Sequence, residues 1–224
     1  MSARRQRQMC IRDRFWSDPI LADAQQLARA TWQKWAIITH DDCAVLSSET
    51  RPYNAFKRSD WSEHCKGLAE LSKVTIVAEH EWERSVDSLL FDTRPPVVPN
   101  DCMLQHFQGI EVKTKQACFD KDMAILMDFR VDQSKGMHFI YLLPYSTTEA
   151  LVESTLFSTE LVDEEFYSTS IENYLKEHCK VEEFSVTHQE KGVIPLGKLA
   201  PHDARIPGLG SNAGATRPAS GYAF

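Results

Sequence analysis

Apolar residues recur at helical spacing in two stretches of the first third of the chain. Residues 17–35 open with Ser-Asp-Pro, a pattern typical of a helix start, and their apolar spacing predicts an amphipathic helix. Residues 60–71 open with an aspartate at the N-cap position and predict a second helix. Short apolar runs at 34–39 and 43–48 flank an Asp-Asp turn and predict a hairpin, while 52–57 form a connector.

Strand-like patterns dominate the rest of the chain. Apolar runs separated by short polar links lie at residues 105–113, 123–131, 137–143 and 150–157. This succession predicts an antiparallel sheet. A helix at 163–179 and another strand at 182–189 follow it. Upstream, short strands are predicted at 74–78 and 88–91, and the proline-rich segment 95–99 is the best internal boundary.

Composition places the chain among ordinary globular proteins. Of its 224 residues, 42% are hydrophobic and 25% are charged. The formal net charge of −7 argues against a nucleic-acid-binding protein, which needs a basic face. No apolar run approaches the roughly 18 residues that a membrane-spanning helix requires. The six cysteines are scattered without a C-x-x-C pair, which predicts a reducing, cytoplasmic compartment and no metal site.

The first fourteen residues differ from the rest of the chain. They are rich in arginine and contain no acidic residue before Asp13. A basic arm or a targeting peptide is one interpretation, but the segment has no apolar core of the kind that secretory signals carry. Its sequence is similar to the read-through translation of a sequencing adapter. We therefore interpret residues 1–14 as a non-native artefact and leave them out of the predicted fold.

The clearest candidate for chemistry is a carboxylate inside an apolar strand. In residues 150–157, Glu153 shares one face with Leu151, Thr155 and Phe157, and the opposite face is apolar too. Because neither face suits solvent, Glu153 is predicted to be at least half buried. Burial favours the neutral carboxylic acid, which can act as a general acid, unless a cation or hydrogen-bond donors oppose it. A structural salt bridge to an arginine is the alternative, and the pattern leaves both open.

A second acidic residue lies on the predicted strand 123–131. Its apolar face also carries Asp128 and Arg130. An acid and a base two residues apart on one strand often form an ion pair, which is the simpler interpretation. If the two strands are close, however, Asp128 and Glu153 become a pair of carboxylates that face one cavity, and their repulsion would hold one proton in place.

Two further motifs suggest ligand contacts. Asp92 and Arg94 follow an apolar run, which predicts either a ligand-binding strand end or a salt-bridged turn. Three glycines follow near the C-terminus: Gly208, Gly210 and Gly214. Their spacing is not that of a dinucleotide fingerprint, although glycines let backbone approach a phosphate or a flavin if a helix begins near Pro218. The eight histidines show no metal or triad spacing and are interpreted as structural.

Seven segments of the chain together resemble the lycopene cyclases, flavoproteins of the bacterial and plant carotenoid pathway. In order they are FDTRP (91–95), QHFQG (105–109), MDFRVDQ (127–133), HFIYLLP (138–144), ALVEST (150–155), GVIP (192–195) and TRPASGYAF (216–224). Their order and separations fit the family from about Phe15 to the last residue.

The resemblance implies an α/β flavoprotein of two domains, similar to the flavin monooxygenases. Residues 15–98 would form part of the FAD-binding domain, residues 99–191 a mostly antiparallel substrate domain, and residues 192–224 a return to the FAD-binding domain. The chain lacks the strand–GxGxxG–helix unit that opens such enzymes. It is therefore expected to be a fragment that is inactive by itself and binds little FAD.

The resemblance also assigns roles to particular residues. Glu153 matches the first glutamate of the plant motif Phe-Leu-Glu-Glu-Thr, which cyclisation needs, and Ser154 replaces the second glutamate. Asp128 is the less secure second catalytic candidate. Asp92 and Arg94 match an Asp-x-Arg motif near the flavin. The second flavin-contacting segment would include Gly208, Gly210, Gly214, Arg217 and Pro218.

The activity implied is that of a bacterial-type lycopene β-cyclase, which closes the ψ ends of lycopene or γ-carotene into β-ionone rings without net redox change. An acid protonates the terminal double bond, the cation closes onto the neighbouring alkene, and a base removes a ring proton. Reduced FAD would assist, NAD(P)H would keep it reduced, and the cytoplasmic protein would contact the membrane peripherally. Two alternatives stay open: a flavin-dependent oxidoreductase or monooxygenase acting on another apolar substrate, and a non-catalytic domain that binds an apolar ligand.

Overall fold

The computed structural model describes residues 12–77, 89–94, 97–99, 101–197, 199, 203–215 and 217. The chain has a mixed α/β fold, as predicted, and divides into two compact units. The first unit comprises Met1–Trp61 and His106–Val193, and the second comprises Ser62–Gln105 and Ile194–Phe224. Residues before Trp61 group with the large sheet. The assignment of domains to FAD and substrate stays a prediction.

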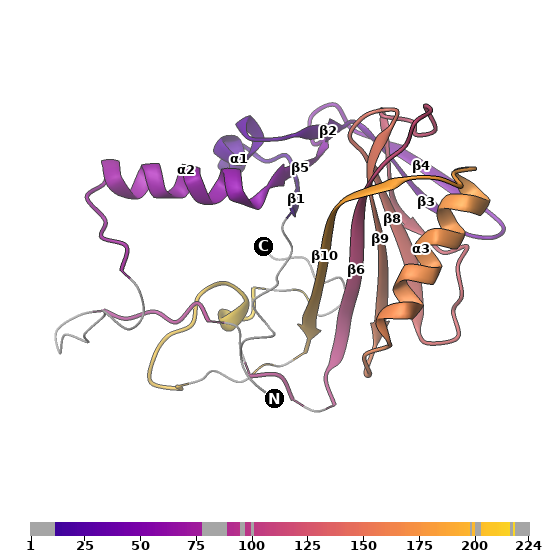
Figure 1. Cartoon of the computed structure of the whole chain (residues 1–224). Helices are drawn as coiled ribbons and strands as arrows, with labels where there is room; N and C mark the ends of the chain where they lie inside the picture. The colour runs from indigo at the N-terminus through magenta and orange to yellow at the C-terminus, as the bar shows by residue number, and fades with distance from the viewer. Residues whose placement is uncertain are drawn as a thin grey trace. The chain divides into compact units, whose positions relative to one another are not determined.

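A seven-stranded sheet forms most of the first unit (Figure 1). Its strands run in the order β10 (Ser185–Leu196), β6 (Met103–Lys113), β9 (Glu149–Ser158), β8 (Met137–Pro144), β7 (Met123–Asp128), β3 (Lys34–Ile38) and β4 (Cys43–Ser47). The pairs β7–β8, β8–β9 and β3–β4 are antiparallel, whereas β3 and β7 are parallel. The predicted hairpin and the strands of the second half are therefore confirmed, although β10 begins three residues after the predicted start at 182 and ends seven residues after the predicted end at 189.

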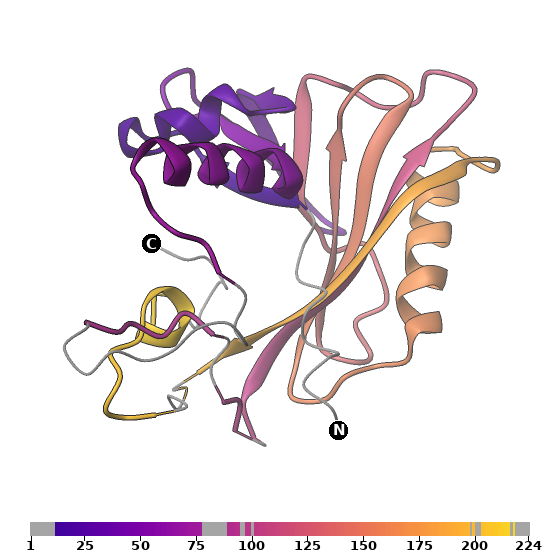
Figure 2. The same cartoon turned by 60° about the vertical axis from the view of Figure 1, so that its left-hand side comes forward.

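One face of this sheet is covered by a helix. The helix α3 (Glu164–His178), orange in Figures 1 and 2, lies along the sheet and confirms the predicted helix at 163–179. Its apolar residues Ile171, Tyr174 and Leu175 pack on Ile140 and Val152 of the two central strands. We call this side of the sheet the helix face.

The opposite face of the large sheet is covered by a small sheet of three strands. We call this face the acid face, because it carries Glu153. The strand order is β1 (Arg12–Trp16), β5 (Tyr53–Lys57) and β2 (Ala30–Trp32). Aromatic side chains fill the space between the two sheets. The buried members of this cluster are Trp32, Tyr53, Ala55, Ala124, Leu126, Phe139, Tyr141, Leu143 and Leu151.

Two predictions for the first sixty residues were wrong. The predicted helix at 17–35 is limited to the short η2 (Pro19–Leu21) and α1 (Ala22–Gln26), after which the chain becomes β2. Trp32 is only 1% exposed and its indole nitrogen donates a hydrogen bond to the carbonyl oxygen of Pro144, at 3.1 Å. Such long-range pairing overrides the local helical spacing. The predicted connector at 52–57 is the central strand β5, for the same reason.

The second unit contains fewer regular elements in its described part. The helix α2 (Arg58–Leu71) begins at the edge of the first unit and confirms the second predicted helix. The strands predicted at 74–78 and 88–91 are absent from residues 74–77 and 89–91, which have no regular structure, and the remaining residues of both lie outside the described part. A parallel bridge joins Asp92 to Gly208, and the short η4 (Gly210–Ala213) follows it.

Candidate acid site

Glu153 is buried on the acid face of the large sheet. Its partner on the adjacent strand β8 is Tyr141, and Leu151 and Thr155 flank it on the same face of β9. The residue is 1% exposed, and the hydroxyl group of Thr155 donates a hydrogen bond to its Oε1 atom at 3.0 Å. The predicted burial of Glu153 is therefore confirmed.

An arginine contacts the Glu153 carboxylate directly. Nη1 of Arg14 donates to Oε1 at 3.2 Å and Nη2 donates to Oε2 at 2.5 Å. The guanidinium group also lies 5.3 Å from the centre of the Tyr141 ring. The salt bridge that the sequence left as an alternative is thus formed. Arg14 belongs to the segment 1–14 that we interpret as non-native, and that interpretation stays a prediction.

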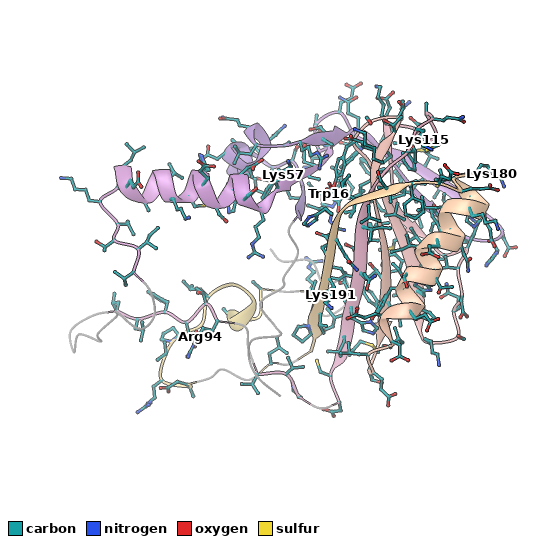
Figure 3. All side chains as sticks on the ribbon, viewed as in Figure 1. Trp16, Lys57, Arg94, Lys115, Lys180 and Lys191 are labelled. Atoms are coloured by element: carbon teal, nitrogen blue, oxygen red, sulfur yellow. The ribbon has the colours of Figure 1, made fainter. Side chains whose placement is uncertain are left out.

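A second buried carboxylate meets the same arginine, and the sequence analysis missed it. Glu190 lies on β10, is 4% exposed, and accepts a hydrogen bond from Nη2 of Arg14 at 3.1 Å. The next residue, Lys191 (labelled in Figure 3), forms an ion pair with Glu164 on α3 at 2.6 Å. Alternation along the strand therefore turns Glu190 to the acid face. The predicted strand ended at residue 189, one position too early for this alternation to reveal it.

A glycine between the two glutamates lets them approach each other. Strand β6 lies between β9 and β10, and Gly109 occupies the position between Glu153 and Glu190. A Cβ atom at Gly109 would lie 3.2 Å from Cγ of Glu190 and 3.3 Å from Cβ of Glu153. These separations are tight for carbon atoms, so a larger residue would press on both side chains. The proximity of Glu153 and Glu190 is therefore set by strands β9, β6 and β10, and it does not depend on any residue of segment 1–14.

Asp128, the other predicted catalytic carboxylate, lies on the helix face. The register between β7 and β8 shifts, since the four residues of β7 from Ile125 to Asp128 match the three of β8 from Leu142 to Ile140. The extra residue is a β-bulge, which reverses the side to which the following side chain points. Asp128 and Glu153 therefore lie on opposite faces of the sheet. The cavity that the sequence analysis expected these two carboxylates to share is not formed.

The contacts of Asp128 are those of a buried ion pair. Arg130 donates to its two carboxylate oxygens at 2.9 and 2.7 Å, and the Tyr174 hydroxyl donates at 2.9 Å. Burial alone would raise the pKa of Asp128, but the hydrogen bonds from Arg130 and Tyr174 outweigh it and hold the pKa below its usual value. Burial raises the pKa of Tyr174, which keeps its hydroxyl group protonated as a donor.

Two buried histidines also lie on the helix face. Nε2 of His138 bonds to the Ser154 hydroxyl at 2.8 Å, and His106 bonds to the hydroxyl groups of Ser158 and Tyr167. Burial lowers the pKa of both histidines, so the neutral imidazole is favoured. Every hydrogen-bonding nitrogen of the two rings has a protein partner, in agreement with the structural role that we predicted for the histidines.

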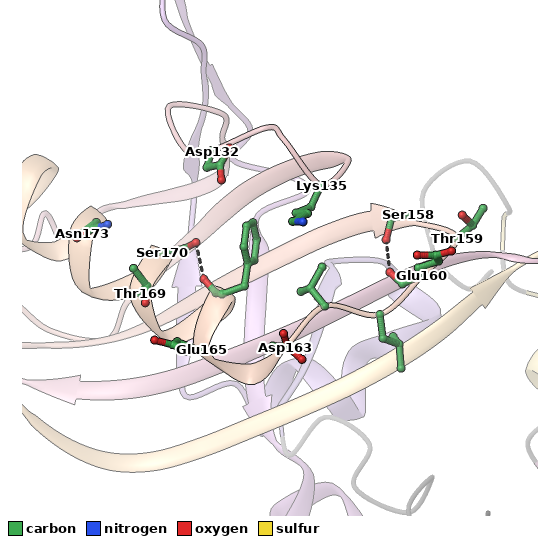
Figure 4. A pocket seen from close by; sticks show the side chains of 13 residues that line it. Asp132, Lys135, Ser158, Thr159, Glu160, Asp163, Glu165, Thr169, Ser170 and Asn173 are labelled. Atoms are coloured by element: carbon green, nitrogen blue, oxygen red, sulfur yellow. Dashed lines mark hydrogen bonds between the residues drawn. The ribbon is translucent and has the colours of Figure 1, made fainter.

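Neither of two cavities in the first unit contains Glu153 or Glu190 in its lining. One of about 690 Å³ lies between α3 and the loops that precede it (Figure 4). Its lining is polar and includes Asp132, Lys135 and Asn173. The other, of about 360 Å³, is lined by Arg29 and Glu111, which form an ion pair at 3.0 Å.

The predicted flavin-contacting residues of the second unit come together from distant parts of the chain. The amide of Asp92 donates to the carbonyl oxygen of Pro207 at 2.8 Å, and the amide of Leu209 donates to that of Asp92 at 2.9 Å. Arg94 forms a bidentate ion pair with the buried Asp92 carboxylate, at 2.9 and 2.8 Å, so the salt-bridged turn is formed. This brings Asp92 and Arg94 beside Gly208 and the η4 turn.

The C-terminal glycines have the backbone conformation that favours glycine. The φ angles of Gly210 and Gly214 are +64° and +77°, and no heavy atom lies within 4 Å of an added Cβ at either position. The turn therefore offers open backbone to a ligand. Arg217 is exposed, and Pro218 lies outside the described residues.

The described residues contain neither a helix that could cross a membrane nor a cluster of metal ligands. None of the helices in this part of the chain combines the length and the apolar character that a membrane crossing requires. Within the same residues, no three His, Cys, Asp or Glu side chains converge as metal ligands.

Known structures share the α/β fold of this chain. A geranylgeranyl bacteriochlorophyll reductase-like protein from Thermoplasma acidophilum superimposes with a TM-score of 0.67 at 12% identity, over 96% of this chain and 64% of that one. The flavin-dependent brominase Bmp2 superimposes with a TM-score of 0.53 at 10% identity, over 87% and 58% of the two chains. At these identities the likeness concerns the fold alone.

Sequence comparison assigns the family. The profile described as "Lycopene cyclase protein" matches residues 12–224, and the chain belongs to this family. A lycopene beta-cyclase from a Paracoccus species is 29% identical over 128 residues, which are 54% of this chain and 32% of the relative. The chloroplastic and chromoplastic lycopene beta cyclase of Narcissus pseudonarcissus is 25% identical over 230 residues, covering 86% of this chain and 45% of the relative. The chain thus spans less than half the length of these curated relatives.

Proposed function

We propose that the protein carrying this chain is a lycopene β-cyclase and that Glu153 is its acid. The observation that supports this is the burial of Glu153 on a sheet face lined with aromatic and aliphatic side chains, in a chain of the lycopene cyclase family. An apolar surface suits a hydrocarbon substrate, and a carboxylate on such a surface is costly unless it is paired, as Glu153 is with Arg14, or used in chemistry. Substrates of this kind are lycopene and γ-carotene.

The proposed reaction moves protons and leaves the oxidation state unchanged. The Glu153 carboxylic acid gives its proton to one carbon of the terminal double bond, which leaves a tertiary cation on the other carbon. The neighbouring alkene supplies its electron pair to close a six-membered ring. Loss of a ring proton to a base then restores a double bond. The aromatic side chains on the acid face exclude water, which would otherwise trap the cation as an alcohol.

A flavin suits the glycine turn of the second unit. Backbone of Gly210 and Gly214 is open to a ligand, and the preceding Gly208 pairs with Asp92, whose carboxylate binds the cationic Arg94. These residues, with Arg217 and Pro218, would hold the cofactor. When bound, reduced FAD would supply electron density that stabilises the cationic intermediate, and NAD(P)H would keep the flavin reduced.

The substrate also implies a location. Lycopene and γ-carotene dissolve in membranes and not in water, so the enzyme would collect them as a cytoplasmic protein attached to the membrane surface. Sedimentation of the full-length protein with lipid vesicles tests this, since a protein that stays in the supernatant with vesicles present would contradict it.

The direct test is conversion of lycopene by the full-length protein that carries this chain, with reduced FAD and lipid present. Cyclised product is expected from the wild-type protein. Glu153→Gln should reduce kcat by about 10²- to 10⁴-fold, the contribution of a general acid, while the variant still binds flavin. Wild-type protein that leaves lycopene unchanged, or a Glu153→Gln variant with the wild-type rate, would refute the proposal.

A further inference from the structure

We propose that Glu190 is the base that completes the reaction, receiving the ring proton after Glu153 has given one to the alkene. The inference rests on the proposed function and extends it to a residue that sequence reasoning had not found. It starts from the position of Glu190, which shares with Glu153 a buried region of the acid face.

The two carboxylates are held close enough to serve one ring. Both accept a hydrogen bond from the same nitrogen atom, Nη2 of Arg14, at 2.5 and 3.1 Å. Their oxygen atoms can therefore be no further apart than the sum of these distances. The contacts around Gly109 show the same proximity independently of Arg14. Glu153 and Glu190 both lie next to the position that a Gly109 side chain would occupy.

The chemistry of the ring requires two proton sites at this separation. Protonation occurs at one ring carbon and deprotonation at another carbon of the same ring or its methyl group. One carboxylate cannot easily contact both atoms while the cation is short-lived. Two carboxylates on strands that flank Gly109 of β6 can, and pairs of acidic residues with divided roles are a recurrent solution in enzymes.

The steps balance as follows. The O–H bond of Glu153 breaks and a C–H bond forms at the terminal alkene, which leaves a carboxylate and a cation. The alkene pair forms the ring C–C bond. A ring C–H bond then breaks, its electrons form the new double bond, and the proton binds the Glu190 carboxylate. No oxidant is needed, and proton exchange between the two acids restores Glu153 before the next cycle.

The test uses Glu190→Gln in the full-length protein with reduced FAD, and it measures kcat, KM and the structure of the ring. Loss of the base should lower kcat by about 10²-fold or more with little change in KM. The cation that still forms would lose a different proton or add water. The product should therefore shift from β rings toward other double-bond isomers or hydroxylated rings, which a purely structural defect would not cause.

Two further variants keep the result decisive. Glu111→Gln removes another buried carboxylate of the same sheet, also paired with an arginine, and should leave the isomer ratio unchanged. Glu190→Asp keeps a carboxylate and should recover part of the activity if Glu190→Gln is inactive. An Asp variant that folds and is as inactive as the Gln variant would overturn the inference, and so would an unchanged rate and isomer ratio in Glu190→Gln. After either of these two outcomes, the proposed function would still hold if the wild-type protein cyclises lycopene and Glu153→Gln does not.

Discussion

Replacing Asp128 by asparagine separates a structural from a catalytic role for this carboxylate. Breaking a buried ion pair by removal of one partner typically costs about 3–5 kcal/mol. Two features reduce the figure here. The Arg130 side chain is 31% exposed and can be hydrated, and the asparagine oxygen can still accept the hydrogen bond from Tyr174. We therefore expect the free energy of unfolding to fall by about 2 kcal/mol.

The assay is urea-induced unfolding followed by tryptophan fluorescence, with cyclase activity measured on the full-length variant. Asp132→Asn is the matched control, because this aspartate is exposed and its carboxylate accepts hydrogen bonds from the nearby Ser134, so its unfolding midpoint should shift little. Activity of Asp128→Asn should fall only as far as its lower stability explains. An unchanged midpoint together with a large loss of kcat would refute the structural role and restore the catalytic one.

Two other predictions concern the sheet. Gly109→Ala should push Glu153 and Glu190 apart and lower kcat by about tenfold or more, because misplacement of about 1 Å can cost 10²-fold. Gly67→Ala is the control, because an added Cβ there meets open space on α2. Equal activities of the two variants would contradict the crowding at Gly109. Because burial lowers the folded pKa of His106 and His138, the unfolded chain binds more protons below about pH 6.5, so stability should fall as pH drops through that value. Unfolding midpoints at pH 5 to 8 test this, and His138→Gln should flatten the slope.

Sequence patterns were sufficient where the structure is local. The strands of the second half and the burial of Glu153 follow from alternation along single strands, which the sequence displays. Glu190 was missed because its importance depends on strand order: β6 lies between β9 and β10, and nothing in the local sequence specifies these neighbours. Asp128 was given the wrong face because one extra residue in β7 changes the alternation. The helix predicted to reach Trp35 failed because pairing with distant strands competes with local spacing.

The bulge in β7 has a consequence for proton supply. It turns Asp128 to the helix face, where His106 and His138 also lie, and away from Glu153 and Glu190 on the acid face. The intervening layer of main-chain hydrogen bonds acts as an insulator, since a strand offers no side-chain route through itself. Any proton that recharges Glu153 must therefore travel within the acid face, between the two sheets. Acids and imidazoles on the helix side can change in number or identity without altering the chemistry on the other.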